Sequence, residues 1–313
     1  MAARSRLPWI ALASLLGAVA ALLLAPRLHA LFADLGWAAR SGPEGREAFL
    51  KVVRRGLMVG AGLPFALALR PWREVPPSAM GFVGPRARPA VGAVACAATL
   101  ATGVLLLAAQ GAAGWWEVLQ PLPVGRAWAH TARVFLVPAL LVAIFEEMLF
   151  RGWLEGRHAA AGRPWRTAAG VSAFYALLHA FRARPRLLDV DMDVGGALEA
   201  LRTWAGRTLE PSVFGPTFVG LFLFGLVLSG TYRRSGTIWA SIGVHAAGIT
   251  LLQAQEAWIV RTPSPAWGGT GRLLDGLPGM AVLVAALAWL VARPGPARAD
   301  QGRSTSSGST PGP

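Results

Sequence analysis

The sequence predicts an all-α membrane protein, a polytopic bundle of about eight transmembrane helices. Hydrophobic residues make up 54% of its 313 residues, charged residues only 15%, and the mean hydropathy is +0.47. A typical soluble domain carries about 25% charged residues, so this chain has more apolar surface than a water-soluble globule can bury. An intrinsically disordered chain requires low hydrophobicity and high charge, so this composition excludes one. The single cysteine, Cys96, excludes a disulfide scaffold.

Eight apolar runs approach the roughly 20 residues that a spanning helix needs. They are Pro8–Pro26, Leu50–Leu69, Ala90–Gln110, Thr131–Arg151, Thr167–Phe181, Val213–Tyr232, Gly236–Gln255 and Leu277–Ala292. The first run is longer than the roughly 7–15 apolar residues of a signal peptide, so we expect a retained helix rather than a cleaved leader. The fifth run is short, and we expect its helix to continue beyond Phe181. The tail 293–313 is predicted to be disordered because it is rich in Gly, Ser, Thr and Pro.

The net charge of +14 comes from arginines and one lysine spread over nearly every connecting segment. Nucleic-acid binders concentrate such charge on one face or arm. Arginines that flank apolar runs instead anchor helix ends and meet anionic headgroups. The expected partner is therefore the lipid bilayer, with no nucleic acid. Basic residues divide evenly between the two sides of the predicted bundle, so the charge pattern leaves its orientation open.

The connection after the fifth run is long and polar. Asp189, Asp191 and Asp193 lie before a segment, 194–207, with helical spacing of its apolar residues. Those apolar residues are Val194, Leu198, Leu201 and Ala205. The pattern predicts an amphipathic surface helix. The aspartates lack the Gly and Glu of an EF-hand loop, so we expect a solvated acidic loop rather than a calcium site.

Ionisable side chains inside apolar runs are the most informative residues, because each costs roughly 2.5–3.5 kcal/mol at the bilayer centre and usually faces a protein interior. The fourth run ends in Glu146 and Glu147, the fifth contains His179, and the seventh contains His245. The other three histidines lie in connecting segments and are expected to be solvated; they are His29, His130 and His158.

Helix geometry separates the two glutamates. Glu147 and Arg151 are four residues apart, with the acid before the base, and can form an ion pair on one face. Glu146 points about 100° away, which leaves it available as a general base. His179 and His245 can then converge with it around one water. The alternatives are an ordinary helix-end ion pair at Glu147 and histidines that hydrogen-bond neighbouring helices.

These residues resemble the CPBP family of intramembrane proteases, which includes the type II CAAX prenyl endopeptidases. The family's first motif is matched by Glu146, Glu147 and Arg151. Its second, an aromatic residue four before a histidine, is matched by Tyr175 and His179. Its third centres on His245. The resemblance covers about Thr131–Gln255 and implies a catalytic core there (131–255), between N-terminal transmembrane helices (1–130) and a C-terminal transmembrane helix (256–292).

The resemblance implies peptide-bond hydrolysis within the membrane. Glu146 and His179 would activate the attacking water, and His245 would stabilise the oxyanion. Glu147 and Arg151 would support them. The family has also been described as metal-dependent, and Glu146, His179 and His245 could form a zinc site. Because no HExxH spacing is present and a glutamate mechanism needs no metal, we expect no cofactor.

The chain departs from the family pattern at two positions. Tyr175 stands where the family usually has Phe. Ile249 stands four residues after His245, where the family commonly has an Asn that assists the oxyanion. Isoleucine cannot donate a hydrogen bond. Either another donor substitutes for it, with Ser241 and Gln253 as candidates, or activity is reduced.

Three functions follow from these residues. We expect an intramembrane endopeptidase that acts on a membrane-anchored protein or peptide, in a multi-pass protein of the plasma (inner) membrane. A catalytically weak member that serves as a membrane binding or scaffold protein is the alternative, suggested by Ile249. A transporter that uses Glu146 and the histidines as a proton relay is less favoured, because no inverted repeat is apparent.

Overall fold

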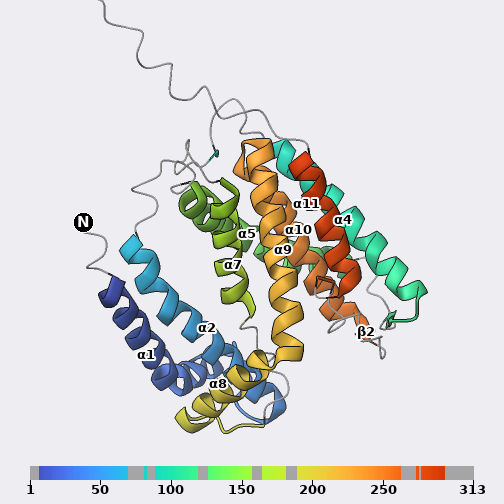
Figure 1. The fold of residues 1–313 in the computed structure, drawn as a ribbon. Helices are drawn as coiled ribbons and strands as arrows, with labels where there is room; N and C mark the ends of the chain where they lie inside the picture. Colours follow the sequence, from blue (N-terminus) through green and yellow to red (C-terminus); the bar gives the residue numbers. More distant parts are fainter. Residues whose placement is uncertain are drawn as a thin grey trace, which may run out of the picture. The chain divides into compact units, whose positions relative to one another are not determined.

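In the residues that it describes, the computed structural model consists of helices and one pair of short antiparallel strands (Figure 1). The elements are α1 (Leu7–Asp34), α2 (Gly42–Leu69), α4 (Pro89–Ala112), β1 (Trp116–Val118), α5 (Arg126–Glu147), the π-helix η1 (Met148–Glu155), α7 (Pro164–Ala180), α8 (Val194–Leu209), α9 (Pro211–Ser235), α10 (Ile238–Trp258), β2 (Ile259–Arg261) and α11 (Leu277–Ala292). The structure describes residues 7–69, 81–82, 89–118, 126–156, 164–180, 189–261, 273–274 and 276–292. The predicted all-α class is confirmed.

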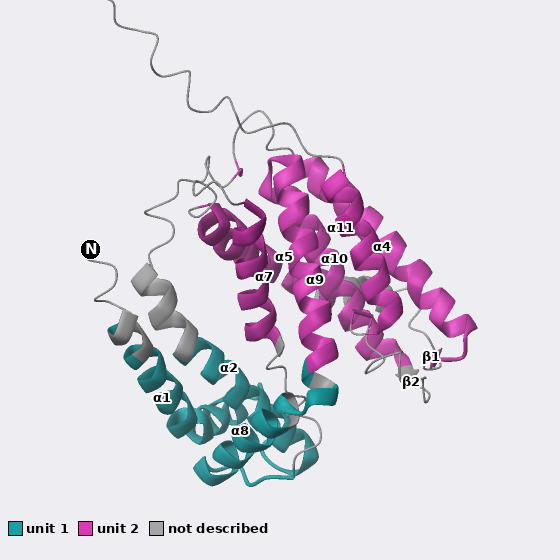
Figure 2. Cartoon of the chain, in the orientation of Figure 1, with its two compact units in different colours: residues 1–74, 180–214 teal, residues 75–179, 215–313 magenta. Residues whose placement is uncertain are grey.

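The chain divides into two compact units (Figure 2). The first comprises residues 1–74 and 180–214 and holds α1, α2 and α8. The second comprises residues 75–179 and 215–313. The segment 180–214, which lies inside the predicted core 131–255, thus groups with the N-terminal helices. Every candidate site residue belongs to the second unit.

In the first unit, α1 and α2 form an antiparallel pair that closes on small residues. Gly17 lies against Gly60 and Ala21 against Gly56, and a Cβ on Gly17 would overlap the Gly60 carbonyl. Such small residues let helix backbones approach closely in membranes. The core that α1 and α2 share with α8 contains Leu22, Ala25, Phe49, Leu50, Val53, Ala197, Ala200 and Trp204.

The expectation that His29 is solvated was wrong. Its side chain is 5% exposed, its Nε2 lies 3.1 Å from the carbonyl oxygen of Ala39, and its ring packs edge-on against Phe49. The reason is that α1 continues through Pro26 to Asp34. His29 is therefore part of a helix, on the face turned to α2, rather than in a connection. His158 and the side chain of His130 lie outside the described residues.

The helix predicted at 194–207 forms as α8, but its core-facing side is not the predicted apolar stripe. Ala197, Ala200 and Trp204 pack in the unit's core, whereas Leu198 and Leu201 are 51% and 37% exposed. The two alanines face the core because their small side chains let α8 pack closely against the other helices of the unit. The apolar spacing along the sequence does not reveal this preference. The exposed leucines are consistent with the predicted membrane-surface helix.

Two of the three aspartates before α8 have structural partners. Asp193 is the N-cap, and its Oδ1 accepts a hydrogen bond from the Gly196 backbone N–H at 2.7 Å. Asp189 forms an ion pair of 3.1 Å with Arg46.

The second unit carries the largest core, formed mainly by α7, α9, α10 and α11. Its buried members are Phe150, Val171, Tyr175, Ala176, Leu221, Phe224, Val227, Leu228, Val244, Leu283 and Leu290. α4 crosses α10 where Gly92 lies against Gly243. The two backbones are so close there that a Cβ on Gly243 would overlap the Gly92 carbonyl oxygen. This crossing lies two residues before His245 and helps to fix the position of that imidazole.

Three segments of the described chain are long and apolar enough to cross a membrane: Leu12–Asp34, Pro89–Ala112 and Phe214–Ser235. Leu277–Ala292 is apolar but shorter. All eight predicted runs fall on helices, the fourth on α5 and η1 together. The protein is therefore membrane-integral, while the count of eight spans stays a prediction. The tail 293–313 and the continuation beyond Phe181 lie outside the described residues.

Candidate active site

Glu146 and Glu147 end α5, at the point where the backbone changes from an α-helix to a π-helix. The π-helix η1 has five of its eight residues buried and carries Arg151. Such π segments are rare and often occur at functional sites. The sequence pattern predicted an uninterrupted α-helix over Thr131–Arg151, and the π turn is a departure from it. The ion pair expected from the α-helical spacing forms nevertheless.

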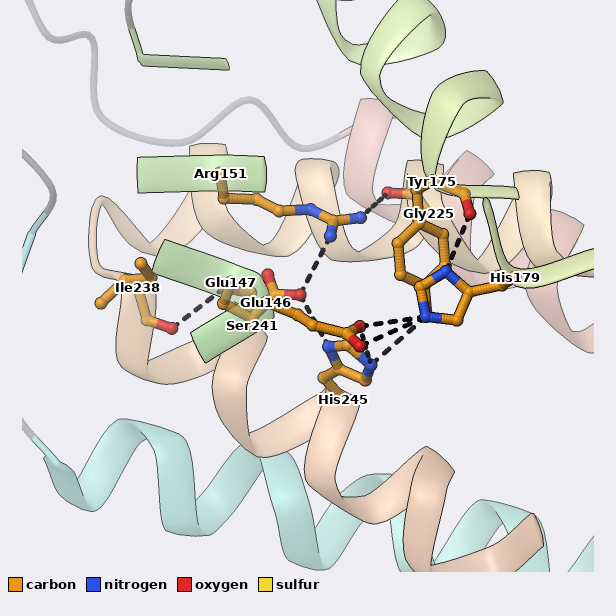
Figure 3. A network of polar contacts seen from close by, with 9 residues as sticks. All are labelled: Glu146, Glu147, Arg151, Tyr175, His179, Gly225, Ile238, Ser241 and His245. Carbon is orange, nitrogen blue, oxygen red and sulfur yellow. Dashed lines mark hydrogen bonds and ion pairs between the residues drawn. The ribbon is translucent and has the colours of Figure 1, made fainter. Parts of the chain in front are cut away.

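Glu147 and Arg151 form a completely buried ion pair (Figure 3). The Arg151 Nη1 donates to Glu147 Oε1 at 3.0 Å, and both side chains are 0% exposed. The Arg151 Nη2 donates to the carbonyl oxygen of Gly225 in α9 at 3.0 Å. Gly225 packs closely against Ser172 of α7, because it has no side chain to separate the two helices. The guanidinium therefore ties η1 to α9.

Glu147 has a second partner that the sequence did not reveal. Its Oε1 lies 2.8 Å from His245 Nδ1 of α10. Arginine stays protonated in proteins and its ion-pair partner is a carboxylate, which only accepts hydrogen bonds. We therefore assign the proton of His245 to Nδ1, which leaves Nε2 directed at the other carboxylate, Glu146.

Glu146 faces both imidazoles. Its Oε1 and Oε2 lie 3.3 Å and 3.2 Å from His179 Nε2, and Oε2 lies 3.5 Å from His245 Nε2. The three side chains come from α5, α7 and α10 and meet at one point (Figure 3). The expected convergence of Glu146, His179 and His245 is thus present in the geometry.

His179 is oriented by its own helix. Its Nδ1 lies 2.8 Å from the carbonyl oxygen of Tyr175, one turn earlier. A carbonyl oxygen only accepts hydrogen bonds, so Nδ1 of His179 carries the proton and Nε2 faces Glu146. Both histidines thus present the same nitrogen to the Glu146 carboxylate.

Aromatic packing sets the ring positions. The Tyr175 ring is 4.1 Å from the His179 ring and 5.4 Å, edge to face, from the Phe150 ring, measured between centroids. Arg151 Cζ lies 5.2 Å from the centre of the Tyr175 ring. Phe224 contacts the His245 ring from α9 at 5.8 Å. Tyr175 is thus the ring around which the polar groups are arranged.

The exposed fraction of the side chains distinguishes the two halves of the cluster. Glu146 and His179 have 20% and 14% of their side-chain surface exposed. His245 is 2% exposed, and Glu147 is fully enclosed. The Glu146–His179 pair is therefore partly exposed at the surface of the unit, whereas Glu147 and Arg151 are enclosed.

The candidate substitutes for the oxyanion donor do not join the cluster. The Ser241 hydroxyl is buried and donates to the carbonyl oxygen of Ile238 at 2.9 Å, within its own helix. Gln253 lies eight residues after His245, about 12 Å along α10. Ile249, one turn after His245, is half-buried. None of these three residues places a donor hydrogen at the imidazoles.

Metal binding was the alternative left open for Glu146, His179 and His245. No group of three or more His, Cys, Asp or Glu side chains in the part of the chain that the structure describes is arranged to hold a metal ion. The expectation that the protein uses no metal stays a prediction.

A known protein family matches this region. Residues 128–248 match the family described as type II CAAX prenyl endopeptidase Rce1-like. The matched region is less than half of the 313-residue chain, and it is similar to that family. The match includes all residues of the polar cluster, and it confirms the resemblance drawn from the motifs. No curated protein and no solved structure matches the chain.

The Rce1-like match supports a membrane protease in general terms. The sequence pattern predicted the titratable members of the polar cluster but not its backbone and aromatic members. The Gly225 carbonyl and the Phe224 ring have no signal in the sequence, because nothing in an apolar run shows which residue of α9 turns toward α5 and α10. The sequence showed Tyr175 as a departure from Phe, but it did not predict that the hydroxyl contacts His245.

Proposed function

We propose that this protein is an intramembrane endopeptidase that hydrolyses a peptide bond of a membrane-anchored protein or peptide. The observation that carries the proposal is the meeting of one partly exposed carboxylate with two imidazole nitrogens, backed by a sealed ion pair. A carboxylate beside histidines is a general base with a nearby proton carrier. The family match supplies the reaction class.

In the proposed mechanism, Glu146 takes a proton from a water molecule as the water oxygen bonds to the scissile carbonyl carbon. The carbonyl π electrons move onto the oxygen and form a tetrahedral oxyanion. On collapse, this electron pair re-forms the C=O bond and the C–N bond breaks. The leaving nitrogen takes a proton from the Glu146–His179 pair, and the products are an amine and a carboxylic acid, which then loses its proton to water.

His245 faces Glu146 through Nε2, and Glu147 holds its ring in one orientation through Nδ1. Arg151 neutralises Glu147, so that the enclosed site contains no uncompensated carboxylate. Glu147 and Arg151 support the reaction without contacting water, because both side chains are completely buried.

The test uses the full chain in proteoliposomes with a farnesylated peptide that ends in a CAAX sequence, the substrate type of the matched family. We expect Glu146→Gln and His179→Ala to abolish cleavage. Glu199→Gln on the exposed face of α8 is a matched control for the loss of a carboxylate, and it should cleave at the wild-type rate. Wild-type cleavage by Glu146→Gln would refute the proposal.

If this peptide is not cleaved, the membrane proteome of cells with active protein is compared with that of cells with Glu146→Gln. A substrate is a protein whose shortened form depends on Glu146. The scaffold alternative makes the opposite prediction, because a Glu146→Gln protein would then keep its full biological effect. The comparisons do not favour that alternative.

A further inference from the structure

The hydroxyl group of Tyr175 lies 3.3 Å from Nε2 of His245. Tyr175 is 3% exposed and its ring is fixed by Phe150, His179 and Arg151. The same Nε2 faces the Glu146 carboxylate. The tyrosine hydroxyl therefore lies where the proposed reaction develops negative charge.

The proton of this contact belongs to the tyrosine when His245 is neutral. Nδ1 of His245 donates to Glu147, so Nε2 of the neutral ring has only a lone pair and accepts from the Tyr175 hydroxyl. Neutral His245 cannot itself donate to an oxyanion. Tyr175 can do so without any change in the charge of the cluster.

The chain also lacks the usual donor on α10. Ile249 has no polar hydrogen, the Ser241 hydroxyl is bound to Ile238 within the helix, and Gln253 is too far along the helix. The two departures noted in the sequence thus fall on one site: a hydroxyl is gained at position 175 and an amide is absent at position 249.

We propose that the Tyr175 hydroxyl donates a hydrogen bond to the oxyanion of the tetrahedral intermediate and replaces the donor that Ile249 cannot supply. This assignment rests on the proposed endopeptidase function. The hydroxyl turns from His245 Nε2 to the substrate oxygen, and no covalent bond of the tyrosine changes.

The surroundings of Tyr175 suit this role. Rigidly held donors are effective because they need no reorganisation as charge develops, and three neighbours hold this ring. The Arg151 guanidinium, 5.2 Å from the ring centre, draws electron density from the ring, which makes the phenolic O–H a better donor. Arg151 thereby acts on the oxyanion through the ring although it is itself enclosed.

The direct test is Tyr175→Phe, which removes the hydroxyl and keeps the ring. Loss of one oxyanion donor lowers kcat by about 10²–10³-fold, and we expect this loss with KM unchanged for the farnesylated peptide in proteoliposomes. Tyr232→Phe is the matched control, because Tyr232 is a buried tyrosine of another cluster; it should retain the wild-type kcat. Thermal unfolding should show that the Tyr175→Phe protein is folded.

The sharper test is rescue by Tyr175→Phe/Ile249→Asn, which restores an amide one turn after His245. We expect the double variant to recover at least about 10-fold in kcat over Tyr175→Phe, about 1.4 kcal/mol of transition-state stabilisation. Ile249→Asn alone should change kcat little, because the Tyr175 hydroxyl already donates a hydrogen bond to the oxyanion. A deficit in Tyr175→Phe that Ile249→Asn does not reduce, or that appears in KM alone, would overturn the assignment.

Failure of this inference differs from failure of the proposed function. If Glu146→Gln is inactive and Tyr175→Phe keeps the wild-type kcat, only the role of Tyr175 is lost. If Glu146→Gln retains cleavage, the endopeptidase mechanism and the role of Tyr175 fail together.

Discussion

Glu146 and Glu147 are adjacent in the chain and have opposite environments. Glu147 is 0% exposed and accepts hydrogen bonds from Arg151 and His245, whereas Glu146 is 20% exposed and faces two imidazole nitrogens. The difference follows from the 100° step between neighbouring helix residues. One glutamate is thereby enclosed with its partners, and the other is partly exposed.

The contact between Glu147 and His245 predicts a kinetic effect from a buried residue. In Glu147→Gln the side chain keeps its shape, but its amide can also donate, so the Nδ1 proton of His245 is no longer fixed. We expect kcat to fall by at least about 10-fold, since replacing the carboxylate that orients a catalytic histidine costs up to about 10⁴ in serine proteases. Nitrogen-15 NMR of labelled histidine checks the tautomer directly.

The control for this variant is Glu155→Gln. Glu155 is also buried, at 1% exposure, and pairs with Arg233 at 2.6 Å rather than with a histidine. Its amide variant should be less stable and should keep the kcat of the wild type in the folded protein. Equal losses of kcat in the two variants would show that any disturbed buried carboxylate has this effect.

Arg151 predicts a stability effect with a characteristic rescue. In Arg151→Met the Glu147 carboxylate stays buried without its cation, which costs roughly 3–5 kcal/mol. We expect a large drop in the thermal unfolding temperature. In Glu147→Gln/Arg151→Met both charges are gone, so the double variant should be more stable than Arg151→Met alone. If the two losses simply add, the ion pair is not the source of the stability.

How much of this site follows from the sequence depends on the range of each contact. The Glu147–Arg151 pair was predictable because four residues separate its members and helix geometry alone sets their distance. The Glu147–His245 contact joins residues 98 apart in the chain. Its formation depends on the rotation of α10, which is set by the Gly92–Gly243 crossing and has no local signal.

In the fold, too, local features were predictable from the sequence and contacts between distant segments were not. Apolar runs located the helices, because the length of an apolar stretch is a local property. The buried face of α8 and the burial of His29 were not predicted, because both depend on which residues of α1 and α2 come near. The π-helix was also missed: hydrophobic periodicity over eight residues does not distinguish a π turn from an α turn.

Gly225 predicts a steric effect on helix packing. A Cβ there would lie 2.9 Å from the Ser172 Cβ and would push α9 away from α7, and with it the carbonyl that binds Arg151. Overpacking of this kind typically costs about 1–3 kcal/mol, and we expect Gly225→Ala to unfold at a lower temperature. Gly215→Ala on the same helix has open space and should be neutral or slightly stabilising.

A second variant identifies the cause. Ser172→Gly removes the side chain that the new Cβ would meet, so Gly225→Ala/Ser172→Gly should recover part of the lost stability. Unchanged instability in the double variant would mean that the added methyl group acts elsewhere than at the α7–α9 contact.

Metal removal separates the two mechanisms that the motif residues allow. In the proposed mechanism a carboxylate activates water directly, and the described residues contain no ligand set for a metal ion. We therefore expect cleavage to survive prolonged dialysis against EDTA or 1,10-phenanthroline, with kcat within about 2-fold of the untreated protein, since removal of a metal that activates the water would cost several kcal/mol of transition-state stabilisation. Cleavage that is lost in the chelator and restored by Zn²⁺ would contradict this mechanism. In that case Glu146→Gln should also release the metal, so measuring bound zinc in the wild type and in Glu146→Gln distinguishes a metal held at this site from one bound elsewhere on the chain.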